Sequence, residues 1–301
     1  MDFCRTVWSV MGMNFRRWKS DVRIWLILGF VGMLLIKELR GITAYGLEHE
    51  AECTAYLFPF LFADSIISVG TMKVMLFLGG ILLLCDAPFI YSNTPYVIMR
   101  SRREKWWISE CLYIFTTVLL YMLFIMLVSM LAVLPVAVFG QEWGNAVFDF
   151  QNGNGTMGAG EIKRAYEIFV IMPRDTVGYL YPLGAHLYTF VTATAALFLL
   201  GLLQYVVNLL TKSMFWGFAA ASAFIFLDPL LYYFSSEPAF RWAPLFSPLC
   251  WINAERLNLV NRNNVLSVPF VVSMFVILTV LLLVIIRSAS KKIMIEVRGE
   301  V

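Results

Sequence analysis

Charged residues are scarce in this sequence. Only 14% of its 301 residues are Asp, Glu, Lys or Arg, whereas 60% are hydrophobic and the mean hydropathy is +0.76. A typical soluble domain contains about 25% charged residues, so a water-soluble fold and a disordered chain are excluded. The net charge of +3 also leaves no extended basic face for nucleic acid. What remains is a polytopic membrane protein.

Residues that commonly carry catalysis or bind metals are also few. The only histidines are His49 and His186, and neither has a second ligand at a suitable spacing. The sequence contains no HExxH, no GxSxG and no GxxxxGK[ST] nucleotide loop. The five cysteines include no CxxC pair and lie at Cys4, Cys53, Cys85, Cys111 and Cys250. We therefore expect no enzyme activity, and no cofactor or metal bound by this chain itself.

Long apolar runs are abundant. A helix needs about 20 apolar residues to cross a hydrocarbon core of about 30 Å. Six runs are predicted to span, the first of them short: 24–36, 70–90, 111–139, 184–210, 214–234 and 268–286. Pro135 predicts a kink or an earlier end in the third run. The expected fold is all-α, a single transmembrane domain over residues 1–301.

The distribution of Lys and Arg predicts the orientation, because cytoplasmic loops are enriched in these residues. With the N-terminus inside, the inner segments hold 14 basic and 5 acidic residues, and the outer loops hold 8 basic and 12 acidic. Both termini are then cytoplasmic, as are the loop 91–109 and the tail 287–301. The outer loops are 37–70, 140–183 and 235–267.

The N-terminal segment 1–21 has the pattern of an amphipathic helix. On a helical projection one side carries Phe3, Val7, Val10, Met11, Phe15 and Trp18. Such an elbow helix would lie along the headgroup boundary and turn into the first span. The alternative is a charged tail that only precedes a membrane helix.

The two long outer loops differ in character. Loop 140–183 is rich in glycine and predicts a flexible turn followed by a short helix at 161–169. Loop 235–267 contains APLFSPLCWINAERLNLV, which is too apolar for an open linker and predicts a helix at the outer leaflet. Its interfacial side chains would be Trp242, Phe246, Leu249 and Trp251. The alternative for this loop is a folded cap without a role in transport.

Two thiols are expected at Cys53 and Cys250, with a disulfide as the alternative.

Few polar residues fall within the predicted spans. Lys73 and Asp86 are interpreted as boundary residues, with Lys73 reaching the outer headgroups. Asp228 lies deeper and precedes Pro229, so its carboxylate either satisfies backbone groups freed by the proline or contacts a translocation pathway. Gln204 is an uncharged candidate for that pathway.

The cytoplasmic loop SNTPYVIMRSRREKWWISE carries the most informative pattern. Thr94 suits a helix N-cap and Pro95 the first helical position. The short helix would present apolar residues to the cytosol and be followed by a basic cluster: Tyr96, Val97, Ile98, Met99, then Arg100, Arg102, Arg103 and Lys105. This arrangement favours docking of a protein partner. The alternative is a set of positive-inside residues with an aromatic anchor.

The chain resembles the ABC type-2 export permeases of bacteria in four features. These are the elbow helix, the six spans, TPYVIM followed by RSRREKWW, and the SPLCW element. The resemblance covers nearly the whole chain, although loop 140–183 is longer than in many members. It implies that 94–103 is a coupling helix on a separate ATPase, and that 244–256, with Phe246, Pro248 and Trp251, closes the outer exit.

The resemblance also implies partners and a location. The expected assembly contains two permease subunits, identical or different, and two copies of an ATPase that binds ATP and Mg²⁺, in the bacterial plasma membrane. We therefore expect the permease subunit of an exporter for a peptide, lipid or drug-like substrate. The alternatives are a non-transporting membrane scaffold or sensor and an ion-coupled secondary transporter.

Overall fold

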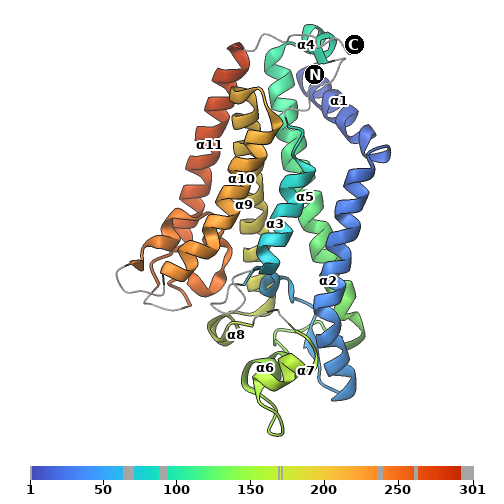
Figure 1. Cartoon of the computed structure of the whole chain (residues 1–301), viewed down its shortest axis with the longest axis vertical. Coiled ribbons are helices and arrows are strands. Elements are labelled where there is room, and N and C mark those ends of the chain that lie inside the picture. Colours follow the sequence, from blue (N-terminus) through green and yellow to red (C-terminus); the bar gives the residue numbers. More distant parts are fainter. Residues whose placement is uncertain are drawn as a thin grey trace.

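The chain folds into a bundle of long helices with a smaller folded region at one end (Figure 1). The computed structural model describes residues 2–63, 71–87, 94–168, 170, 172–235, 240–260 and 264–292. The helices of the bundle are α2 (Val22–Glu48), α3 (Thr71–Leu83), α5 (Arg103–Val133), α9 (Pro182–Thr211), α10 (Met214–Phe234) and α11 (Val268–Lys292). The other α-helices described are α1 (Asp2–Arg16), α4 (Thr94–Ser101), α6 (Asn145–Asn152), α7 (Ala159–Ala165) and α8 (Arg174–Tyr179).

The short elements gather at opposite ends of the bundle. Helices α1 and α4 lie at one end, together with the last turn of α11, and α6, α7 and α8 lie at the other (Figure 1). We refer to these as the α4 end and the α6 end. At the α6 end, strands β1 (Cys53–Thr54) and β2 (Ala137–Val138) pair in parallel and join the connections after α2 and α5.

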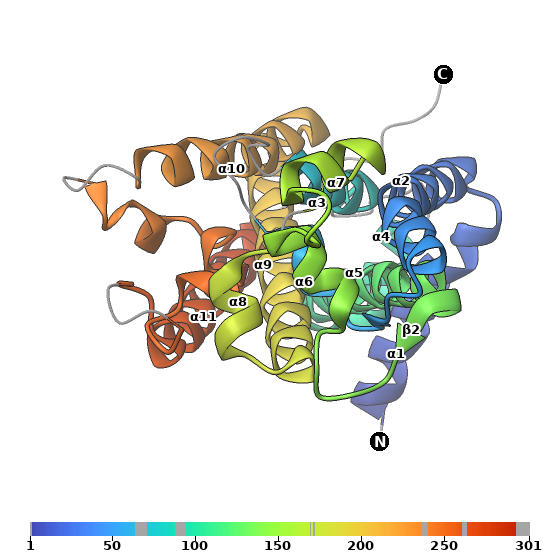
Figure 2. The ribbon, with the colours of Figure 1, turned by 90° about the horizontal axis from the view of Figure 1, so that it is seen from below.

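Helix α9 forms the centre of the bundle. It packs against α5, α10 and α11, and the view along the bundle shows it between these neighbours (Figure 2). In its most apolar stretch 67% of the residues are buried, compared with 22% in α10 and in α11. The outward faces of α10 and α11 are therefore largely uncovered by other described parts of the chain.

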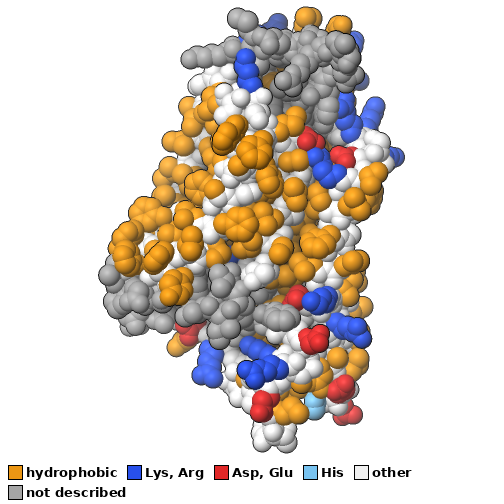
Figure 3. Space-filling model, in the orientation of Figure 1, with side chains coloured by type: hydrophobic (Ala, Val, Ile, Leu, Met, Phe, Trp, Pro, Cys, Tyr) orange, Lys and Arg blue, Asp and Glu red, His pale blue; other side chains and the backbone are white. Residues whose placement is uncertain are grey.

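Four helices are long and apolar enough to cross a membrane: Arg103–Val136, Pro182–Thr211, Met214–Leu231 and Val268–Ser290. They correspond to the last four predicted spans. In the described part of the chain, the first two predicted spans do not meet the same test. Helix α2 includes the charged residues Lys37, Glu38 and Arg40, and α3 is apolar but only 13 residues long. Positions 70 and 88–90 of the second span lie outside the described residues. One face of the molecule has hydrophobic side chains over most of its middle and charged side chains toward the ends (Figure 3). This distribution is the one expected of helices that cross a membrane.

Three helix ends differ from the limits of the predicted spans. Helix α2 continues past residue 37, where an outer loop was expected, and ends at Glu48. Helix α5, which contains the third predicted span, begins at Arg103 rather than 111 and ends at Val133, directly before a 3₁₀ turn that contains Pro135. This end agrees with the earlier stop that proline predicts, because proline cannot donate the next helical hydrogen bond.

Helix α1 has the predicted amphipathic character, but its apolar side faces protein. Val7, Val10 and Met11 are buried, and α1 packs mainly on α5. Phe3, expected on the same side, is 47% exposed. A polar contact contributes to this packing, since the buried amide of Asn14 donates to the carboxylate of Glu110 at 3.1 and 3.3 Å.

The loop 140–183 contains more structure than its glycines predict. The expected short helix is present as α7 at Ala159–Ala165, and residue 169 lies outside the described part. Helices α6 and α8 were not predicted. Trp143 is buried and its indole donates to the carbonyl of Leu180 at 2.9 Å, which ties the two halves of the loop together.

Candidate functional site

Helix α4 forms at the predicted position and has one buried and one exposed side. Ile98 is only 7% exposed and packs with Val10 of α1 and Trp106 of α5. Tyr96 and Met99 are 75% and 81% exposed. The side chains of Thr94 and Pro95 lie outside the described part, so their capping role stays a prediction.

This geometry corrects one predicted anchor. Ile98 was expected to contact a partner, but the helical spacing turns it inward, while Tyr96 and Met99, three residues apart, share the outward side. Val97 is partly buried against the same inner cluster. An aromatic ring and a thioether therefore form the described apolar part of the outward face of α4.

A basic rim adjoins this face. Arg100, Arg102 and Arg103 are exposed, as predicted for this cluster. Arg102 has φ = 66°, a left-handed conformation that ends α4 and starts α5 directly afterwards. Its backbone N–H donates to the carbonyl of Ile98 at 2.9 Å, so α4 is connected to the long helix α5 without a flexible linker.

A second polar site lies inside the bundle, toward the α6 end. The Nζ atom of Lys73, in the first turn of α3, lies 2.5 Å from Oδ2 of Asp228 in α10, and both side chains are 0% exposed. The interpretation of Lys73 as a headgroup contact is therefore wrong, because its ammonium group is enclosed and ion-paired. Asp86, the other boundary residue, is partly exposed and pairs with Arg23 at 2.5 Å.

The second carboxylate oxygen of Asp228 holds the loop after α10. Ser247 is buried, and its hydroxyl donates to Oδ1 of Asp228. The same hydroxyl oxygen accepts from the backbone N–H of Cys250 at 3.3 Å. These two side-chain contacts of Asp228 connect α3, α10 and the outer loop. The roles predicted for it, beside Pro229 or in a translocation pathway, stay predictions.

In its described part the predicted outer loop forms a series of 3₁₀ turns, where a membrane-surface helix was expected. The turns are Ala243–Phe246, Cys250–Ile252 and Ala254–Arg256, and we call residues 244–256 the outer element. Residues 236–239 and 261–263 of the predicted loop lie outside the described part.

Two of the predicted interfacial side chains in this loop are buried. Trp251 is 1% exposed and Leu249 is 0% exposed. The Trp251 ring packs against Phe275 of α11, with ring centroids 5.1 Å apart, and its indole donates to the carbonyl of Pro244. Trp242 and Phe246 are exposed, in agreement with the prediction, and Pro248 is partly buried.

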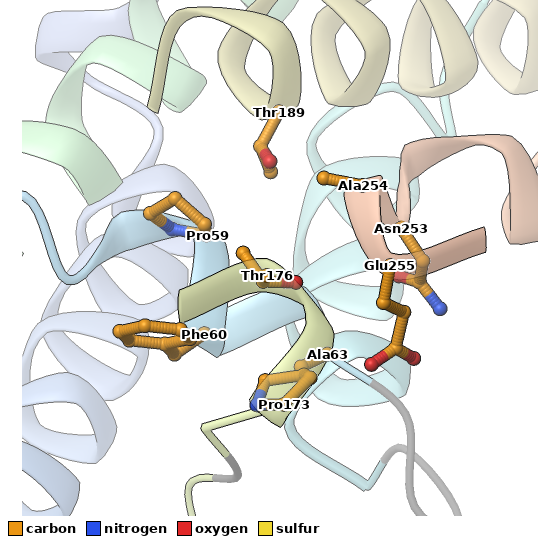
Figure 4. A pocket seen from close by; sticks show the side chains of 9 residues that line it. All are labelled: Pro59, Phe60, Ala63, Pro173, Thr176, Thr189, Asn253, Ala254 and Glu255. Atoms are coloured by element: carbon orange, nitrogen blue, oxygen red, sulfur yellow. The ribbon is translucent and has the colours of Figure 1, made fainter. Parts of the chain in front are cut away.

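The contact between the outer element and the bundle leaves little free space. A cavity of about 10 Å³ lies between the outer element, α8, α9 and the 3₁₀ turn Phe58–Phe62, lined among others by Thr176, Thr189 and Glu255 (Figure 4). A volume of this size accommodates about one water molecule. This cavity is therefore too small for a larger solute.

Near the α4 end, two amides lie one helical turn apart on α9. Gln204 is 0% exposed, and neither atom of its amide has a hydrogen-bond partner among the described residues. Asn208 donates to the carbonyl of Ala87 at 2.6 Å and accepts from the N–H of Gly217 at 2.8 Å. Gln204 thus faces the bundle interior, as a pathway residue would, but it lies apart from Lys73 and Asp228 along the helices.

Sequence reasoning missed Ser247, Asn208 and the pairing of Lys73. The available signal was a lysine and an aspartate in two separate apolar runs, because an enclosed charge generally requires a partner.

All five cysteines are thiols, and Cys53 and Cys250 are buried separately, as expected. Comparisons of the chain with protein-family models, with curated proteins and with solved structures give no match.

Proposed function

We propose that this chain is the permease subunit of an ATP-driven exporter of the ABC type-2 kind. Its substrate would be a peptide, a lipid or a drug-like molecule, and it would lie in a bacterial plasma membrane with both termini in the cytoplasm. The observation that carries the proposal is the outward face of α4, where Tyr96 and Met99 are exposed beside three arginines at the end of an apolar bundle.

A physical argument supports a protein partner at this face. An eight-residue helix is too short to be stable alone in water, so α4 depends on packing. Ile98 supplies that packing on the inner side. The outer side exposes two large side chains next to exposed arginines, and a lipid core is a poor environment for such a cluster. A protein surface with apolar pockets and acidic residues at its rim would cover both features.

The connection of α4 to α5 suggests how force would travel. Helix α5 has 31 residues and runs from the α4 end to the α6 end. An ATPase that binds and hydrolyses ATP with Mg²⁺ would move α4, and α5 would carry that displacement through the bundle. Two permease subunits and two ATPase subunits form the proposed assembly, with six spans in each permease and the exposed faces of α10 and α11 available to lipid or to the second permease.

Purification of the tagged protein from its native membrane, followed by mass spectrometry of its partners, tests this proposal. We expect an ATPase at one copy per permease, with ATP hydrolysis that responds to substrate. Purification without any ATPase would favour the scaffold or sensor. Transport in proteoliposomes that requires an ion gradient but no ATPase would favour a secondary transporter.

A further inference from the structure

We propose that Lys73, Asp228 and Ser247 form a latch that holds the outer element closed against helices α3 and α10. This inference rests on the proposed function, in which the outer element closes the exit. The three side chains come from three separate parts of the chain and are all buried. In this arrangement Asp228 is shared, with one oxygen on Lys73 and the other on Ser247.

Stability alone is a weak reason for this ion pair. Removing a lysine and an aspartate from water costs several kcal/mol per ion, and replacing such a pair by apolar residues is often neutral or stabilising. Stability therefore does not account for the ion pair of Lys73 and Asp228. The side chain that the pair positions does.

Lys73 is the positioning residue of the latch. Its ammonium group contacts one carboxylate oxygen and orients the carboxylate so that the other oxygen faces the Ser247 hydroxyl. Ser247 in turn accepts from the N–H of Cys250, which fixes the start of the turn Cys250–Ile252. The ion pair is therefore connected to the middle of the outer element through one hydroxyl group.

The backbone next to the latch is suited to bending. Pro229 lies inside α10 directly after Asp228, and a proline within a helix removes one backbone hydrogen bond and favours a kink. A change of angle at Pro229 would turn Asp228 relative to Lys73 on α3 and withdraw the acceptor from Ser247. Bending of α10 would then release the outer element.

Two native cysteines provide the probe. Cys250 lies in the outer element and Cys53 in strand β1, and both are 0% exposed thiols. A small, membrane-impermeant maleimide would be applied to the full-length protein in membrane vesicles, without ATP, and labelling of each cysteine would be followed by peptide mass spectrometry. When opening is fast relative to labelling, the rate reports the open population.

We expect Ser247→Ala to raise the labelling rate of Cys250 about ten- to a hundredfold, because it removes a hydrogen bond to a charged group. The rate at Cys53 should stay at its wild-type value. Ser273→Ala is the matched control, since this exposed serine on α11 donates only within its own helix, to Pro269. It should change neither rate.

A double variant removes the charges without leaving one of them alone. Lys73→Met with Asp228→Leu keeps the site filled and apolar and leaves neither charge buried without its partner. Ser247 then has no carboxylate acceptor, so Cys250 should again be labelled faster while Cys53 is unchanged. Wild-type labelling of Cys250 in both Ser247→Ala and the double variant would overturn the latch. A parallel increase at Cys53 would also overturn it, because the contacts would then support the α6 end as a whole.

The assay separates this inference from the proposed function. It requires no ATPase and no substrate, so the latch can be refuted in a protein that transports. If the latch variants release Cys250 but no ATPase is found with the wild type, the latch stands and the exporter assignment fails.

Discussion

The outward face of α4 can be tested by substitutions that separate docking from folding. The double change Tyr96→Ala and Met99→Ala removes the two exposed side chains, whereas Ile98→Ala removes the buried one. We expect the first to release the proposed ATPase partner from an intact protein. We expect the second to destabilise the protein itself.

The expected magnitudes follow from exposure. Surface substitutions away from special features usually change the free energy of unfolding by less than about 0.5 kcal/mol, so the changes at Tyr96 and Met99 should leave stability nearly intact. As anchors at the centre of an interface, such side chains typically account for about 1–4 kcal/mol of binding. This corresponds to roughly a 5- to 1,000-fold loss of affinity. The cavity left by Ile98→Ala should cost about 2–5 kcal/mol of folding free energy.

The assay measures three quantities for each variant: abundance in the membrane, thermal stability in detergent, and the amount of ATPase that co-purifies. Tyr179→Ala is the control, because Tyr179 is 69% exposed but lies in α8 at the opposite end. Co-purification of the Tyr96 and Met99 double variant with its ATPase at wild-type stoichiometry would refute the docking face. Loss of the ATPase from Ile98→Ala with unchanged thermal stability would also refute it, because a buried side chain would then act on docking and not on folding.

Three further predictions concern topology, thiol reactivity and the contact between helices. Met157→Cys at the α6 end should react with an impermeant maleimide in intact cells and Arg102→Cys only after permeabilisation; labelling of both in intact cells would contradict the orientation. Burial raises the pKa of the Cys53 thiol to about 12, so at pH 8 only about one thiol in ten thousand is ionised. Cys53 should react at least about a hundredfold more slowly than the exposed Cys4, more quickly as pH rises toward 12, and equal rates at pH 8 would show that β1 is open. Asn208→Ala leaves a buried carbonyl and a buried N–H without their partner and should lower the free energy of unfolding by about 2–4 kcal/mol; a change below about 0.5 kcal/mol in thermal or denaturant unfolding would contradict this.

The helices were predictable because apolar runs are a local property. The last four spans, the elbow helix α1 and the short helix α4 all lie close to their expected positions. The extension of α2 was missed because Lys37 and Glu38 resemble the start of a loop. In the structure Leu35, Leu39 and Ile42 lie on one side of α2 and are all 0% exposed, so packing continues the helix past the charges.

The buried polar contacts were not predictable, because they depend on which helices become neighbours. Lys73 was expected to reach the headgroups, which is the usual solution for a lysine near the end of an apolar helix. Its actual partner, Asp228, is far away in sequence and becomes available only when α3 packs against α10. Likewise, nothing in the pattern TPYVIM distinguishes the inward Ile98 from the outward Met99 until α1 and α5 take their places beside it.

Helices α3 and α10 are joined by buried polar contacts at both of their ends. At the α6 end the contact is the pair of Lys73 and Asp228, and at the α4 end Asn208 of α9 bonds both the carbonyl of Ala87, just after α3, and the N–H of Gly217 in α10. Sliding of one helix past the other would break these contacts, and each buried group left unsatisfied costs about 1–3 kcal/mol. The contacts of α11 with α9 are largely apolar and lack this penalty. We therefore infer that α3, α10 and the adjoining part of α9 resist relative sliding. In the proposed exporter, a displacement entering through α4 and α5 would then reach the outer element by bending α10 at Pro229 rather than by moving it out of register.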